Sequence, residues 1–438
     1  MSLYSKILQL DTAGSFDFYT TVISLDAVDP RSFERLRLRN STPVSPTAPT
    51  MDDFIMHDAI MPLIAHEYTH FIDATSTCWG LYHLSLLDNA YRAALGMREG
   101  NFHHLKTLHD HLRGLRIPLY YRTIERTAPR TLEWRYQVTI GRRFTSSGHL
   151  DNAPPILFCS FYNSEGKRLA RAPISTLSLL ETSAMAQELQ SRYSMLSLIS
   201  GPEAIVEKRR QNDNVLRHLY DHTITEYSVC AHLVANYQQC TDIISGYVLA
   251  GMLSRFVLDF PWKGYQFLAK SPIIGALFQG PDAKIYEDAI RQGLVVGDGG
   301  ILYYLLVHTL PKGAAESRVS MVDALESTVH AWGLQMDKLR DDSLAEGQKF
   351  ASHVLTSPSP ALREIGMAGY KNQISIGQSD LKLDFCSLQL PQAMFGDCES
   401  YSVFDSPGNA LGKISTEFFF NDLYPLERRT EDFAEACV

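Results

Sequence analysis

The chain has 438 residues, a length that favours two or three lobes over one simple core. Hydrophobic residues make up 45% of it and charged residues 20%, a balance that is typical of globular proteins and excludes wholesale disorder. The formal net charge of −9 argues against general nucleic-acid binding, which needs concentrated lysine and arginine.

Cysteine usage and the N-terminal sequence bear on the cellular compartment. The seven cysteines are scattered and form no C-x-x-C pair, which predicts free thiols in a reducing environment. The N-terminal residues lack the sustained apolar segment of a secretory signal peptide. The longest apolar stretches, 243–253 and 301–307, are shorter than the roughly 20 residues of a membrane-spanning helix. We therefore expect a soluble cytoplasmic protein without a membrane partner, and export as an effector without a signal peptide stays open.

The N-terminal part of the chain changes from strand to helix patterns. Residues 15–24 carry aromatic and β-branched side chains in partial alternation and predict a strand, with 32–38 a weaker one. Three prolines among Ser, Thr and Asn predict a linker over 40–50. From residue 51 to about 76 the apolar spacing becomes helical, and Pro62 suits the first turn of a helix that contains the residues after it.

The middle of the chain predicts helices on both sides of a small sheet. Apolar spacing predicts amphipathic helices over 81–97 and 103–115. Residues 132–145 and 155–162 predict strands, and the turn-like sequence that follows them predicts a hairpin. A further helix is predicted over 174–196, with serine and threonine available to cap its start.

The C-terminal half is mainly helical by the same criteria. Residues 203–260 and 282–355 predict helices, whereas 381–390 is strand-like and a polar tail follows it. The fold class that we predict is α+β and predominantly helical. We divide the chain into an N-terminal β-rich segment with a Pro-rich linker over 1–50, a core with a strand-containing insertion over 51–260, and a mainly helical region over 261–438.

The most informative motif is an H-E-x-x-H, formed by His66-Glu67-Tyr68-Thr69-His70. On a helix, positions i and i+4 project from one face, so His66 and His70 can direct imidazole nitrogens at one ion. Glu67 then stands beside that ion, where it can accept a proton from a metal-bound water and deliver it to a leaving amine. This spacing predicts a catalytic Zn²⁺ site with Glu67 as the catalytic base.

A catalytic zinc needs a third protein ligand, and three carboxylates are candidates. Glu181 is our first choice, because it lies inside the helix predicted over 174–196 and small residues that permit close packing follow it. Asp88 is the rival. Asp73 shares a helix face with His66 and His70, but seven residues at 1.5 Å rise place it roughly 10 Å from His66 along the axis. Asp73 therefore suits the orientation of a histidine ring better than direct ligation.

These residues resemble the zincin metallopeptidases, and specifically the gluzincin branch to which thermolysin-like enzymes belong. The similarity covers about residues 51–200, and the long interval between His70 and Glu181 accommodates the strand-containing insertion. The resemblance implies a zincin-like catalytic core beside a small sheet, with a large helical region after it. Gluzincins usually add a tyrosine or histidine that stabilises the oxyanion. Four residues after the Glu181 helix are candidates: Tyr227, Tyr237, His222 and His232.

The sequence thus predicts a zinc metallopeptidase, a hydrolase that cleaves peptide bonds of a protein or peptide substrate. The alternative is a catalytically inactive zincin-like protein whose helical region over 203–355 binds a regulatory protein partner. A weaker third possibility is a metal hydrolase that acts on another amide with the same ligands. In none of these do we expect a nucleic-acid partner.

Overall fold

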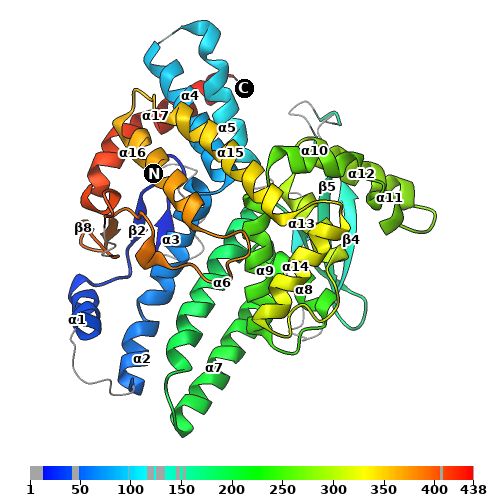
Figure 1. Ribbon diagram of the computed structural model, residues 1–438, viewed down its shortest axis with the longest axis horizontal. Coiled ribbons are helices and arrows are strands. Elements are labelled where there is room, and N and C mark those ends of the chain that lie inside the picture. The colour runs from blue at the N-terminus through cyan, green and yellow to red at the C-terminus, as the bar shows by residue number, and fades with distance from the viewer. Residues whose placement is uncertain are drawn as a thin grey trace. The chain divides into compact units, whose positions relative to one another are not determined.

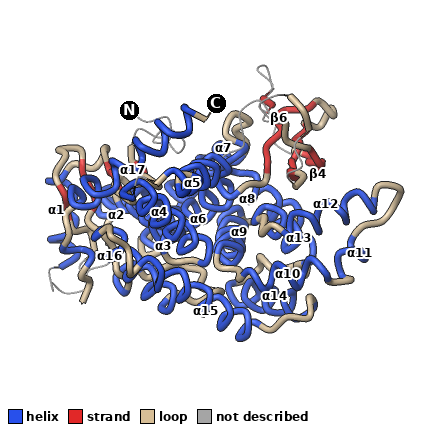
Figure 2. The backbone as a smooth tube through the Cα atoms, turned by 90° about the horizontal axis from the view of Figure 1, so that it is seen from above, coloured by secondary structure: helices blue, strands red, loops and turns tan. Residues whose placement is uncertain are grey.

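The computed structural model describes residues 13–41, 49–96, 98–115, 123–124, 134–144, 148–150, 154–404 and 408–437. Helices predominate throughout these residues, as Figure 2 shows, and two small sheets accompany them. The predicted fold class, α+β and predominantly helical, is therefore confirmed.

The chain divides into two compact units that alternate along the sequence. The first comprises Met1–Gly114, Ala184–Arg210 and Leu344–Val438, and the second comprises Leu115–Ser183 and Gln211–Ser343. Three of the four boundaries between the units fall inside long helices, which are α6 (Thr176–Leu196), α7 (Pro202–Leu219) and α15 (Met336–Val354). The fourth lies just before Leu115, the last residue of α5 (His103–Leu115). The linear division at residues 50 and 260 stays a prediction.

The sheet of the first unit pairs strands from the N-terminal and C-terminal parts of the chain. Its order is β1 (Ser15–Phe16), β2 (Ile23–Leu25), β7 (Ala393–Phe395) and β8 (Ser400–Tyr401), and β2 is parallel to β7. The strand predicted over 15–24 is thus two short strands with a turn between them. Asp17 causes this turn, because its Oδ1 accepts hydrogen bonds from the backbone N–H of Tyr19 at 2.9 Å and of Thr20 at 2.7 Å.

The described residues of the first unit form seven further helices. They are α1 (Pro30–Ser41), α2 (Met51–Asp58), α3 (Met61–Thr75), α4 (Cys78–Gly96), α5 (His103–Leu115), α16 (Pro360–Ser375) and α17 (Thr416–Ala436). Helix α3 contacts β1, β2, α4 and α16, and Figure 1 shows it beside β2. The predicted helices over 81–97 and 103–115 correspond to α4 and α5.

Two local features fix the ends of α3. The helical pattern over 51–76 is interrupted at Ala59 and Ile60, so α3 begins at Met61 with Pro62 in its first turn, as predicted. At the other end, Gly80 of α4 and Gly369 of α16 lie against α3. A Cβ at Gly80 would lie 2.5 Å from the Asp73 carbonyl oxygen, and one at Gly369 would lie 2.1 Å from that of Thr75. Only glycine permits these close approaches.

The second unit contains an antiparallel sheet in the order β3 (Thr123–Ile124), β6 (Arg168–Pro173), β5 (Ile156–Tyr162) and β4 (Arg135–Gly141). The predicted strands over 132–145 and 155–162 and the hairpin after them are therefore confirmed. The helices of this unit are α8 (Thr225–Gln238), α9 (Ile243–Leu258), α10 (Trp262–Lys270), α11 (Ile273–Leu277), α12 (Ala283–Val295), α13 (Gly299–Thr309) and α14 (Arg318–Ala331). Helix α8 contacts β6, α9 and α13.

Some sequence-based assignments are wrong. The weaker strand predicted over 32–38 lies in α1, where Phe33 and Leu36 are buried one helical step apart. The strand-like 381–390 contains only a 3₁₀ turn at Phe385–Ser387. The C-terminal tail carries α17, which the predominance of polar residues obscured. The linker predicted over 40–50 falls mostly on 42–48, outside the described residues.

Among the described residues, no single helix is long and apolar enough to cross a bilayer. Tyr227–Gln238 and Ile243–Leu258 pass the same length and composition criterion only as a pair, bent by 114°.

Candidate metal centre

The two motif histidines lie one turn apart on α3 with their rings directed at each other. The Nε2 atoms of His66 and His70 are 3.2 Å apart. Two nitrogens bound at about 2.0–2.1 Å to one tetrahedral ion would lie about 3.3 Å from each other. The helix therefore holds the two imidazoles at the spacing that a shared ion requires.

Helix α6 supplies the third member of the group. Ligand atoms of His66, His70 and Glu181 all lie within 4.8 Å of one another, with His70 and Glu181 buried and His66 half-buried. The three residues that the sequence predicted as ligands are thus brought together, although Glu181 follows His70 by more than a hundred positions. This group could hold a metal ion.

A second carboxylate on α6 orients one of the ligands. His66 Nδ1 lies 3.1 Å from Oε2 of Glu188. A carboxylate only accepts hydrogen bonds, so the proton of a neutral His66 ring belongs on Nδ1. The lone pair is then on Nε2, which faces His70 and the space between the ligands. Such a carboxylate contact is the usual means of fixing the tautomer of a metal-binding histidine.

Arg192 connects this carboxylate to the end of α2. Its guanidinium lies 3.4 Å from Glu188 Oε1 and 2.5 Å from Asp58 Oδ1. The sequence analysis gave Glu188 no role. A usable signal existed, because Glu188 follows Glu181 by seven positions and so lies on the same face of α6.

Of the two central residues of the motif, Tyr68 attaches α3 to another segment of the chain. The hydroxyl of Tyr68 is fully buried and donates to the Pro391 carbonyl at 2.8 Å. Thr69 Oγ1 donates to the Ala65 carbonyl at 2.6 Å within the helix. The Tyr68 contact helps to hold α3 in one rotational setting, whereas the Thr69 bond lies within the helix.

The proposed catalytic base, Glu67, is 6% exposed and lies against the chain just before β1. A Cβ built on Gly14 would lie 3.2 Å from both Cγ and Oε1 of Glu67, and 3.0 Å from the Ser24 carbonyl oxygen. The absence of a side chain at Gly14 therefore makes room for the Glu67 carboxylate. Sequence reasoning did not identify Gly14.

The two rival carboxylates are buried but do not join the group of possible ligands among the described residues. Asp88 Oδ2 lies 2.7 Å from Arg92 Nε and 3.1 Å from His353 Nε2, so this carboxylate belongs to a separate ion-pair cluster on α4. Asp73 lies fully buried near the C-terminal end of α3. The idea that Asp73 orients a histidine ring stays a prediction, whereas Glu188 is seen to contact His66.

The residues predicted to stabilise an oxyanion have mainly structural surroundings. His232 Nε2 donates to the Leu219 carbonyl at 2.6 Å, and its ring stacks on Trp134. The hydroxyl of Tyr237 donates to the His308 carbonyl at 2.7 Å. Tyr227 is buried in α8, and His222 lies in the turn before that helix. None of these contacts gives a reason to prefer one candidate, and the oxyanion role stays a prediction.

Comparisons of the chain with protein-family models, with curated proteins and with solved structures found no match.

Proposed function

We propose that this protein is a zinc-dependent metallopeptidase of the gluzincin type that cleaves a protein or peptide substrate. The observation that carries the proposal is the convergence of His66, His70 and Glu181 on one point, with Glu67 next to a ligand on the same helix. Two imidazoles and one carboxylate match the ligand set of catalytic zinc sites that hydrolyse amides.

The donor set and its geometry fit zinc. Three protein ligands leave one coordination position for water or substrate, which distinguishes a catalytic site from a closed structural one. The 3.2 Å separation of the histidine Nε2 atoms agrees with tetrahedral coordination. When bound, zinc supplies a Lewis acid that polarises a substrate carbonyl and makes water a stronger acid.

In this proposal Glu67 transfers the proton, and Glu188 and Gly14 orient the residues around it. Glu67 accepts a proton from the attacking water on a carboxylate oxygen and delivers it to the nitrogen of the leaving amine. Glu188 keeps the proton of His66 on Nδ1, so that Nε2 remains a ligand. The close approach of Gly14 confines the Glu67 side chain.

We also propose that the protein acts in the cytoplasm. The structure contains no disulfide at any of the seven cysteines, all of which lie in its described part, and Cys78, Cys159 and Cys230 are buried. Free thiols support a reducing compartment, where disulfides are rare.

The test combines metal analysis with a substitution of the base. The purified protein should contain about one equivalent of zinc. Glu67→Gln should lower the cleavage of a diverse peptide library by about 10²- to 10⁴-fold, the range for loss of a general base, while the zinc content stays unchanged. Glu165→Gln, in the exposed turn between β5 and β6, is the matched control and should leave cleavage intact.

Three results would reject the proposal. A purified protein that contains no zinc, or far less than one equivalent, would show that it is not a zinc enzyme. Equal cleavage by the wild-type and Glu67→Gln proteins would show that Glu67 is not the base. Cleavage by neither of them would favour the inactive, partner-binding alternative.

A further inference from the structure

The second unit contains a hollow that takes no part in the proposed chemistry. Its volume is about 320 Å³, at the small end of the range for ligand pockets. It would hold a small molecule or a single side chain. The residues that line it come from β4, the segment between α11 and α12, and α12 and α13: Tyr136, Val138, Phe278, Gln279, Pro281, Asp282, Ala283, Tyr286, Tyr304 and His308.

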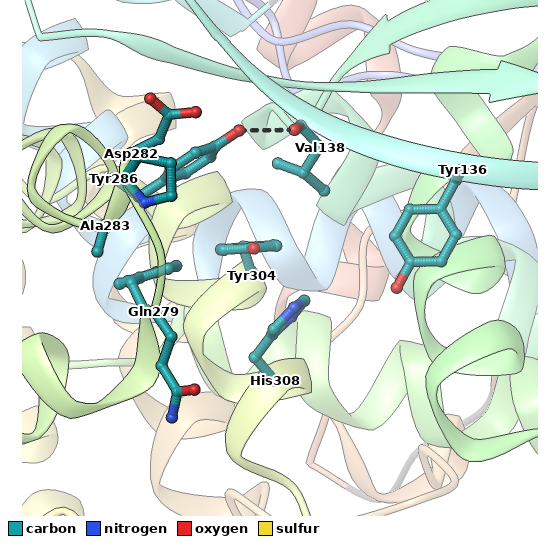
Figure 3. A pocket seen from close by; sticks show the side chains of 10 residues that line it. Tyr136, Val138, Gln279, Asp282, Ala283, Tyr286, Tyr304 and His308 are labelled. Atoms are coloured by element: carbon teal, nitrogen blue, oxygen red, sulfur yellow. Dashed lines mark hydrogen bonds between the residues drawn. The ribbon is translucent and has the colours of Figure 1, made fainter.

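Five of the ten residues that line this hollow carry an aromatic ring. Figure 3 shows Tyr286 on one side and Tyr136 on the opposite side, with Tyr304 and His308 between them. The rings of Tyr304 and His308 have centroids 4.2 Å apart, and Tyr286 stacks on Phe278 at 5.7 Å. The face of an aromatic ring is electronegative, so several rings around one space favour a positively charged guest.

One hydrogen bond fixes an important part of this wall. The hydroxyl of Tyr286 donates to the Val138 carbonyl at 3.1 Å, as the dashed line in Figure 3 marks. Val138 lies on β4, which is an edge strand of its sheet. Because this hydroxyl is committed to the strand, Tyr286 offers the hollow its ring rather than a hydrogen-bond donor.

The charge of the lining residues also favours a cation. Asp282 is the only acid among the ten lining residues, and no lysine or arginine is among them. Asp282 is exposed and occupies the N-cap of α12, and its side chain makes no capping hydrogen bond to that helix. Burial, together with the nearby Lys312, lowers the pKa of His308, which keeps this ring uncharged at neutral pH.

We propose that this hollow is a binding site for an organic ammonium group, held by the aromatic rings and by the Asp282 carboxylate. Such a group occurs in free choline-like molecules and in the alkylated lysine side chains of proteins. The site belongs to the second unit alone and does not depend on the metallopeptidase proposal.

The test compares each cation with a neutral molecule of the same shape. Choline and 3,3-dimethyl-1-butanol would be titrated into the full chain and followed by ligand-observed NMR. N-acetyl-trimethyllysine methylamide and its neutral carbon analogue would form the second pair. Each cation should bind at least about 5-fold more tightly than its analogue if it is a natural type of ligand, since cation–π attraction has this magnitude. The pair with the larger ratio indicates whether the source is a small molecule or a protein side chain.

Two variants locate the binding. Asp282→Asn should weaken binding of the preferred cation about 5-fold. Asp288→Asn should not, because Asp288 is a likewise exposed acid of α12 that does not line the hollow. Phe278→Ala should weaken it similarly, and a circular-dichroism spectrum would confirm that this half-buried position tolerates the change. The proposal is overturned if both cations bind no better than their analogues, or if Asp282→Asn and Asp288→Asn behave alike.

Discussion

Glu188→Ala should weaken metal binding although Glu188 is not itself a proposed ligand. Its Oε2 lies 3.1 Å from His66 Nδ1 and holds the proton on that nitrogen. Without this acceptor, the His66 ring can rotate and can carry its proton on Nε2, the atom that must bind the ion. Metal binding would then have to fix the ring orientation and move the proton back to Nδ1. Both steps cost free energy, so the metal binds more weakly.

The expected size of the effect follows from the type of contact. Loss of a carboxylate partner to a metal-binding histidine weakens metal affinity by about 10- to 100-fold, or about 1.4–2.7 kcal/mol. Glu188→Gln should have a smaller effect, because the amide oxygen can still accept from Nδ1 but carries no charge. Charge-assisted hydrogen bonds are about twice as strong as neutral ones. The predicted order of affinity is therefore wild type, Glu188→Gln, Glu188→Ala.

Competition with a chromophoric zinc chelator would measure these affinities without reference to any catalytic activity. Glu287→Ala is a matched control, because Glu287 pairs with Arg291 at i, i+4 and its side chain is 21% exposed, against 19% for Glu188. Glu287 contacts no histidine of the metal group. If Glu188→Ala and Glu287→Ala bind zinc equally well, the assigned role of Glu188 is wrong.

Three further predictions concern the surroundings of the site and the buried histidines. Gly14→Ala should lower kcat about 10-fold at unchanged zinc content, because the new Cβ would displace Glu67; an unchanged kcat in a peptide-cleavage assay would contradict this. Asp88→Ala should lower the free energy of unfolding in urea by about 1.5 kcal/mol through loss of the pair with Arg92, whose side chain is 38% exposed and can be hydrated instead. Zinc affinity should stay intact, and a large loss of affinity would restore Asp88 as a ligand. Burial lowers the pKa of His83 to about 4, so the folded state takes up this proton less readily than the unfolded state does. The stability that this histidine contributes should be complete above about pH 6.5 and should fall by roughly 2 kcal/mol between pH 7 and pH 5. Urea titrations at the two pH values would show a smaller fall in His83→Gln.

The parts of the site that the sequence predicted are those with local patterns. Apolar spacing and Pro62 located α3, and the i, i+4 spacing then placed His66 and His70 on one face. Glu181 could be chosen because it lies inside a predicted helix. Each of these inferences needs only residues within about two turns of one another, which is the range over which helix periodicity carries information.

The parts that escaped prediction depend on contacts between distant segments. Glu188 and His66 are 122 positions apart, and the parallel pairing of β2 with β7 joins residue 23 to residue 393. No periodic pattern links such positions. Two- and three-residue strands such as β1 and β7 are also too short to show alternation, so their existence depends on the sheet that they form.

Helix α6 supplies the two carboxylates that the H-E-x-x-H motif on α3 lacks. Glu181 and Glu188 are two turns, or about 10 Å, apart along its axis. Glu181 supplies a possible ligand atom to the group with His66 and His70, while Glu188 contacts the His66 ring at Nδ1. Since both contacts come from one face of α6, a shift of this helix by a single turn would remove the third ligand and the orienting carboxylate together. The register of α6 against α3 therefore determines whether the H-E-x-x-H sequence can act as a metal centre at all. Arg192 on α6 contacts both Glu188 and Asp58 of α2, and this ion pair with Asp58 helps to stabilise that register.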